Sequence, residues 1–198
     1  MSRARPLVIG LTGSIGMGKS TTAQMFRDEG VPVWDADAAV HRLYDVGGAA
    51  VEPMRALFPD AVADGAVDRA RLKARISRDP DALRQIEAVV HPLLHRDREA
   101  FFAGLDTDIA VLDFPLLFET GADERVDYIV VVSAPAHVQK ARLKERGTMD
   151  SAMLETVLAS QMPDSEKRSR ADTVIETTSM DAAREAVRDI LRKVREHA

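Results

Sequence analysis

The sequence contains neither cysteine nor asparagine, and aromatic residues make up only 5% of it. The lack of cysteine excludes disulfides, zinc–thiolate sites and cysteine nucleophiles. The lack of asparagine excludes the Asn-Lys-x-Asp motif with which GTP-binding switch proteins recognise guanine, although Asp45–Gly48 formally fits their Asp-x-x-Gly pattern. No apolar stretch reaches the ~20 residues that span a bilayer. We therefore expect no membrane association and no guanine recognition of that type.

The length of 198 residues suits one large domain or a core with insertions. The net charge of −5 argues against general nucleic-acid binding, which favours a basic surface. Residues 1–6 contain no separate apolar region or cleavage site, so we expect no signal peptide and a cytoplasmic protein. Any site for phosphate must then concentrate its positive charge locally.

A glycine-rich segment dominates the first 30 residues. The apolar run Leu7–Leu11 predicts a buried parallel strand, and Thr21–Asp28 predicts a helix. Between them, Gly13–Ser20 fits the phosphate-loop (Walker A) pattern G-x-x-x-x-G-K-[ST] without a mismatch. Glycines let such a loop wrap around phosphate oxygens, and its N–H groups point inward at the start of the helix. This strand–loop–helix context predicts a nucleoside triphosphate site rather than an ordinary turn.

Two side chains of this loop have specific expected roles. Lys19 supplies positive charge to the β- and γ-phosphates, and the Ser20 hydroxyl is a ligand for Mg²⁺. ATP and Mg²⁺ are therefore the expected cofactors. The residues expected to surround the phosphates are Gly13, Ser14, Ile15, Gly16, Met17, Gly18, Lys19, Ser20 and Thr21.

Two carboxylates, Asp35 and Asp37, follow a second short strand, Val31–Trp34. Ligands of open parallel sheets bind beyond the carboxyl ends of the strands, so we expect at least one of the two to be catalytic. The alternative is that one simply caps the helix that starts near Ala38.

The stretch 38–104 has a helical pattern without a convincing strand, and His91-Pro92 is expected to restart a helix with proline in its first turn. Part of so long an insertion should form a wall beside an acceptor substrate. His91 is either part of that wall or a structural histidine.

Three further apolar segments, Ile109–Leu112, Tyr128–Val132 and Ala171–Ile175, complete five predicted strands. Their alternation with helices predicts a single α/β domain with a parallel sheet. Asp113 follows the third strand, as a metal-orienting carboxylate would, but aspartate is common at strand ends and this contact stays open.

The segment 142–170 is rich in basic residues. Arg142 and Arg146 share one helix face, and Met162–Asp164 forms a hinge between a second helix, Asp150–Gln161, and the basic stretch Lys167–Arg170. The segment is either a solvated, salt-bridged helix pair or a mobile lid that brings arginines to the transferring phosphate. The need of an acidic protein for local positive charge favours the lid.

A wider set of motifs occurs in a specific order: Ile9–Ser20, Asp35–Asp37, His91-Pro92, Pro115–Glu119, Gln161 and Ala171-Asp172. This order resembles that of dephospho-CoA kinases from about Val8 to Leu191. The resemblance implies a phosphotransferase with an alcohol acceptor, in which ATP phosphorylates the ribose 3′-hydroxyl of dephospho-CoA. The products are CoA and ADP, in the last step of coenzyme A biosynthesis.

The resemblance also implies a nucleotide-kinase-like phosphate-loop NTPase fold with a core (approximately 7–37, 105–141 and 171–198), a helical acceptor-binding region (38–104) and a lid (142–170). In that scheme Asp37 is the base for the 3′-hydroxyl, Asp35 shapes the acceptor site, and Arg142 contacts the ATP phosphates. The acceptor-side wall comprises His91, Leu116, Leu117, Phe118 and Glu119.

The implied partner is dephospho-CoA, without nucleic acid or membrane, and the chain is expected to be a monomer or a weak homo-oligomer. Another small-molecule or nucleotide kinase of this class, or a regulatory phosphate-loop NTPase, stays the alternative.

The sequence departs from the family pattern in three places. Ser14 replaces a frequent glycine, Val157 replaces a frequent arginine, and Glu176–Ser179 lacks the usual asparagine and glycine.

Overall fold

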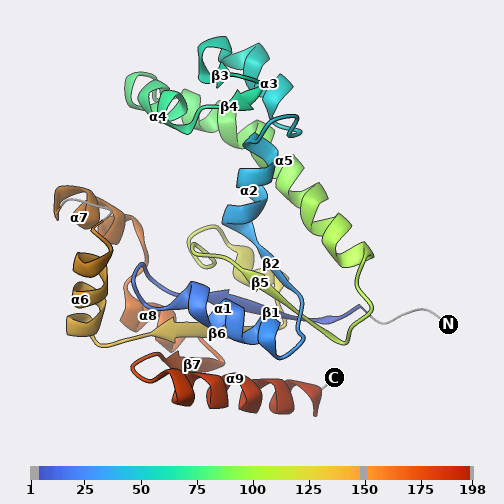
Figure 1. Cartoon of the computed structure of the whole chain (residues 1–198), viewed down its shortest axis with the longest axis vertical. Helices are drawn as coiled ribbons and strands as arrows, with labels where there is room; N and C mark the ends of the chain where they lie inside the picture. Colours follow the sequence, from blue (N-terminus) through green and yellow to red (C-terminus); the bar gives the residue numbers. More distant parts are fainter. Residues whose placement is uncertain (1–4, 148–150, 197–198) are drawn as a thin grey trace. The chain divides into compact units, whose positions relative to one another are not determined.

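The computed structural model describes residues 5–147 and 151–196 (Figure 1). They form two compact units. The sheet unit extends to Trp34 and resumes at Asp106, and the helical unit spans Asp35–Leu105. The stretch 142–170 falls within the sheet unit, and its separate role as a lid stays a prediction.

The sheet unit is built on five strands, which lie side by side in the order β2 (Val33–Asp35), β5 (Ile109–Asp113), β1 (Leu7–Thr12), β6 (Tyr128–Ser133) and β7 (Thr173–Glu176). The central strand β1 pairs in parallel with both β5 and β6, and β7 pairs in parallel with β6. The predicted five-stranded parallel sheet is confirmed. Parallel pairing brings the end of β5 beside β1, with Leu11 opposite Asp113.

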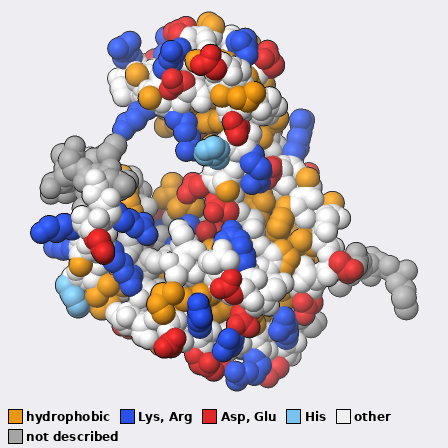
Figure 2. All heavy atoms as spheres, viewed as in Figure 1, with side chains coloured by type: hydrophobic (Ala, Val, Ile, Leu, Met, Phe, Trp, Pro, Cys, Tyr) orange, Lys and Arg blue, Asp and Glu red, His pale blue; other side chains and the backbone are white. Residues whose placement is uncertain are grey.

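Helices and loops cover both faces of this sheet. Successive strand residues point to opposite faces, so Val130 and Val132 belong to one core cluster and Val131 to another. The first cluster packs the sheet against α1 (Lys19–Asp28) and α9 (Met180–Arg195), which lie together on one side (Figure 1). On the face drawn in Figure 2, acidic and basic side chains are interspersed around α9.

The stretch between β6 and β7 is helical. It contains α6 (Ala136–Arg146), α7 (Ser151–Ser160) and α8 (Asp164–Ser169). We call these three helices and their connections the arm. The helix expected from Asp150 begins at Ser151 within the described residues, and Asp150 itself lies outside them. The short helix α8 begins at Asp164, the last residue of the expected hinge, and contains most of the basic stretch Lys167–Arg170. A 3₁₀ turn, η2 (Ala122–Arg125), lies between β5 and β6.

The helical unit has its own core, formed by α2 (Ala36–Tyr44), α3 (Val51–Leu57), η1 (Pro59–Ala61), α4 (Arg69–Arg78) and α5 (Ala82–Ala103). Its largest buried side chains include Met54, Phe58 and Ile86. Among the described residues, no helix is long and apolar enough to cross a membrane.

The expectation that residues 38–104 contain no strand is wrong. Strands β3 (Val62–Ala63) and β4 (Ala66–Val67) form an antiparallel hairpin. Asp64 and Gly65 connect them with φ angles of 50° and 79°, and the tight two-residue hairpin turn needs positive φ at both positions. Strands of two residues leave too little alternation to be recognised, although Asp-Gly is itself a hairpin signal.

The expected helix restart at His91-Pro92 is also wrong, because α5 continues through Pro92. Proline lacks the N–H that would bond one turn back, which weakens a helix locally. Here Val90 is buried before the proline, and Leu93 and Leu94 pack on the same core after it. Packing on both sides explains why the helix does not end there.

Candidate active site

The phosphate loop connects β1 to α1 as the motif predicts. Gly16 and Gly18 have φ angles of 79° and 93°, which glycine adopts without strain. A Cβ atom on Gly13 would lie 2.6 Å from the carbonyl oxygen of Val132, so the loop passes directly against β6. Ser14 is not among the residues with positive φ. Serine is therefore tolerated where the family often has glycine.

Lys19 begins α1 and forms an ion pair with Asp113. The side chains are 16% and 2% exposed, so this pair lies largely out of water. Asp113 reaches Lys19 because the ends of β5 and β1 are adjacent in the sheet. The aspartate whose role the sequence left open therefore lies at the phosphate-loop lysine.

Two glutamines of the arm hold the peptide groups of Ile15. The Gln161 side-chain oxygen accepts a hydrogen bond from the Ile15 N–H at 3.1 Å. The Gln139 side-chain amide donates to the Ile15 carbonyl at 2.7 Å. Gln139 belongs to α6 and Gln161 follows α7, so two separate parts of the arm contact the tip of the phosphate loop.

Arg142 extends from α6 toward the segment after β7. Its guanidinium donates to the carbonyl oxygen of Thr177 at 2.5 Å and to the Thr177 hydroxyl at 2.9 Å. A longer contact of 3.5 Å reaches the carbonyl of Gly16 in the phosphate loop. The arginine assigned to the ATP phosphates is thus held beside that loop.

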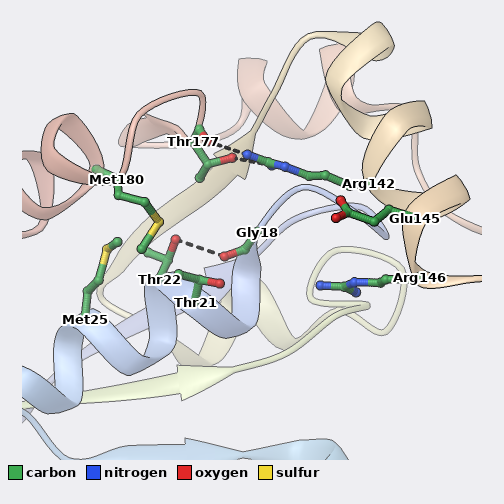
Figure 3. Close-up of a pocket in the computed structure, with 10 residues that line it drawn as sticks. Gly18, Thr21, Thr22, Met25, Arg142, Glu145, Arg146, Thr177 and Met180 are labelled. Atoms are coloured by element: carbon green, nitrogen blue, oxygen red, sulfur yellow. Dashed lines mark hydrogen bonds between the residues drawn. The ribbon is translucent and has the colours of Figure 1, made fainter.

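A pocket of about 350 Å³ adjoins these groups (Figure 3). One side is apolar, with Met25 and Met180, and the opposite side carries Arg142 and Arg146 from α6. The residues that line the pocket are Gly18, Thr21, Thr22, Met25, Arg142, Glu145, Arg146, Thr177, Met180 and Ala183.

The helical unit carries three other predicted residues. Asp35 caps α2, since its side chain accepts a hydrogen bond from the Ala38 N–H at 2.9 Å. Asp37 lies in the first turn of α2 with an exposed side chain. His91 is exposed on α5, which does not suit a buried structural histidine.

Comparison with known proteins identifies the family. The model of the family described as "Dephospho-CoA kinase" matches residues 7–182. The chain belongs to the dephospho-CoA kinase family. A dephospho-CoA kinase from Ruegeria pomeroyi is 59% identical over 94% of this chain and 95% of its own length.

Solved structures share the fold of this chain. The crystal structure of a Thermus thermophilus protein is similar with a TM-score of 0.86 and 36% identity, covering 96% of this chain and 98% of that one. A dephospho-CoA kinase from Campylobacter jejuni shares the fold with a TM-score of 0.65 and 20% identity, over 96% of this chain and 98% of its own.

The family's Pro-Leu-Leu-Phe-Glu run belongs to the sheet unit, and part of it is buried there. Leu117 and Phe118 are buried in the cluster on the second face of the sheet, whereas Leu116 is 39% exposed. Glu119 accepts hydrogen bonds from the Lys167 ammonium at 2.9 Å and from the Met162 N–H at 2.7 Å. The role of these residues as an acceptor-side wall stays a prediction.

Lys167 is a residue that the sequence did not single out. It is fully buried in α8, where it contacts Glu119 and donates to the Pro115 carbonyl at 3.3 Å. Burial raises the pKa of Glu119, but hydrogen bonds from Lys167 and Met162 outweigh it and hold that pKa below its usual range. No local signal separates Lys167 from the exposed basic residues that follow it.

The structure shows where the other two departures from the family pattern lie. Val157 is partly buried in α7, and as a neutral residue it brings no positive charge to this position. Thr177, in the loop that lacks asparagine and glycine, is half-buried and lines the pocket. Its place directly after the last strand is the signal that could have identified it, because ligands gather at such strand ends.

Proposed function

We propose that this protein is an ATP-dependent dephospho-CoA kinase, which transfers the γ-phosphoryl group of ATP to the ribose 3′-hydroxyl of dephospho-CoA and releases CoA and ADP. The observation that carries the proposal is family membership over residues 7–182, combined with a phosphate loop whose lysine and glycines have the required geometry. The acceptor dephospho-CoA is the substrate in the names of its relatives.

ATP binds through the phosphate loop in this proposal. The N–H groups of the loop and the start of α1 hold the phosphates, and Lys19 adds positive charge. The adenosine part enters the adjoining pocket, whose 350 Å³ lies within the range of roughly 300–1,000 Å³ usual for small-molecule sites. Met25 and Met180 then contact the base, and Arg142 lies at the phosphate side.

Mg²⁺ is a proposed companion of ATP. The hydroxyl of the exposed Ser20 and the carboxylate of Asp113 are oxygen ligands of the kind that Mg²⁺ prefers. Ser20 directly follows Lys19, and Asp113 forms an ion pair with Lys19. They would hold the ion with help from the phosphates, and the ion would neutralise charge on the transferred group.

The transfer itself requires alignment and charge neutralisation more than strong acid–base chemistry. A carboxylate oxygen of Asp37 accepts the proton of the 3′-hydroxyl as the oxygen attacks the γ-phosphorus, and ADP leaves on the opposite side. Asp35 supports Asp37 by fixing the start of α2. His91 and the run Leu116–Glu119 are the proposed acceptor-side residues. The cytoplasmic location and the monomeric or weakly oligomeric state stay predictions.

The proposal is tested by measuring ATP-dependent ADP release with Mg²⁺ in the presence of dephospho-CoA, AMP, CMP, shikimate, adenosine or no acceptor. Turnover with dephospho-CoA alone, giving a product with the mass of CoA, is the expected result. Turnover with another acceptor would indicate a different small-molecule kinase. Slow hydrolysis independent of any acceptor would indicate a regulatory NTPase.

A further inference from the structure

Thr177 connects three parts of the sheet unit at the edge of the pocket. It follows β7 directly, and its N–H donates to the carbonyl of Ser133, the last residue of β6, at 3.0 Å. This bond fixes the backbone of Thr177 to the end of the sheet. Its side chain is therefore presented from a backbone that is tied to the end of β6.

The hydroxyl of Thr177 forms a hydrogen-bonded bridge between the phosphate loop and Arg142. It donates to the carbonyl of Met17 at 2.7 Å, and it accepts from the Arg142 guanidinium at 2.9 Å. A hydroxyl has a single proton to donate, so the carbonyl of Ser133, at 3.4 Å, is the weaker alternative. Arg142 also donates to the carbonyl of Thr177, so its guanidinium makes a bidentate contact with this residue (Figure 3).

The same side chain packs against the loop. A Cβ atom added to Gly18 would lie only 3.1 Å from the Thr177 hydroxyl oxygen and 3.2 Å from its Cβ. Gly18 directly precedes Lys19, the first residue of α1. Thr177 thus contacts the phosphate loop at the residue that leads into its lysine.

We propose that Thr177 is a positioning residue for the kinase reaction, whose hydroxyl holds the Arg142 guanidinium against the phosphate loop before ATP binds. The inference rests on the proposed function, in which Arg142 contacts the ATP phosphates. A long arginine side chain loses rotamer freedom when it binds an anion, and an arginine that is already held has less to lose. The hydroxyl, rather than the threonine methyl group, carries this role.

The first test compares Thr177→Val with Thr177→Ser. Valine keeps the shape but removes both hydroxyl bonds, so kcat/KM for ATP should fall about tenfold, the size expected for one hydrogen bond to a charged group. Serine keeps the hydroxyl and should stay within about twofold of the wild type. The control is Thr178→Val, because the neighbouring Thr178 is exposed and its hydroxyl donates to Glu176.

A double-mutant cycle with Arg142→Gln tests whether Thr177 acts through that arginine. Thr177→Val should lower kcat/KM about tenfold in the wild type and less than about twofold in the Arg142→Gln background. An equal loss in both backgrounds overturns the inference. So does a Thr177→Val enzyme with unchanged kinetics, or a Thr177→Ser enzyme as impaired as the valine variant.

Failure of the inference can be told apart from failure of the proposed function. A wild-type protein that does not phosphorylate dephospho-CoA removes the proposed acceptor, while calorimetric ATP affinities of the same variants still test the Thr177–Arg142 coupling. Melting temperatures of all variants show whether each is folded. If Thr177→Val does not fold, Thr177→Ala takes its place, with the same expected loss and the same contradicting result.

Discussion

At the scale of single residues, Lys19 is the charge that the phosphate loop depends on. Its ion pair with Asp113 keeps the ammonium group beside the loop rather than in solvent. Lys19→Ala should therefore weaken ATP binding and abolish phosphoryl transfer, as measured by calorimetry and by ADP release. Lys140→Ala removes the same charge from an exposed position on α6 and should leave both unchanged. An active Lys19→Ala enzyme would contradict the phosphate-loop assignment.

Asp37 is the second decisive residue. Asp37→Asn removes the proposed proton acceptor but keeps the size of the side chain, so kcat should fall by about 10²–10⁴-fold while ATP affinity survives. Asp45→Asn is the control, because this exposed aspartate follows the opposite end of the same helix, α2. Undiminished turnover by Asp37→Asn would exclude it as the base.

At the scale of elements, an ion pair with a fully buried lysine, Lys167–Glu119, fixes α8 to the segment between β5 and η2. Lys167→Met removes the cation and leaves the carboxylate of Glu119 without it, which typically costs about 3–5 kcal/mol of unfolding free energy. Urea denaturation measures this loss. Lys140→Met, at an exposed position, should change stability by less than about 0.5 kcal/mol. Equal effects of the two variants would show that the pair does not anchor α8.

The same pair gives a pH dependence. The pKa of Glu119 is lower in the folded protein than its ordinary value of 4.5, so the ionised carboxylate stabilises the fold above that value. This contribution is lost as the pH falls through the folded-state pKa. The stability difference between the wild type and Glu119→Gln should be constant near neutral pH and shrink below about pH 4.5. A difference that grows on acidification would contradict this assignment of the shift.

At the scale of the whole molecule, the sequence predicts features that local patterns encode. The apolar run Tyr128–Val132, rich in β-branched residues, and the glycine motif before Lys19 suffice to predict the sheet, the phosphate loop and the class of ligand. Three features depend on tertiary packing instead. Strands of only two residues form the β3–β4 hairpin, packing carries α5 through Pro92, and burial of Lys167 requires its distant partner Glu119.

The strand order could not be predicted either, because sequence periodicity does not say which strands become neighbours. That order is what brings Asp113 to Lys19. Likewise, the contact between Arg142 and Thr177 joins residues that the sequence separates by α7, α8 and β7. Such contacts follow from the fold and carry no local signature.

The most direct measurement of the central claim is the position of the transferred phosphoryl group. Dephospho-CoA, ATP and Mg²⁺ are incubated with the protein, and the product is examined by ³¹P NMR with proton coupling. The account predicts a new phosphomonoester resonance coupled to the ribose H3′ proton, formed in equal amount with ADP. No monoester, or one coupled to a different ribose proton, would contradict phosphorylation of the 3′-hydroxyl by this protein.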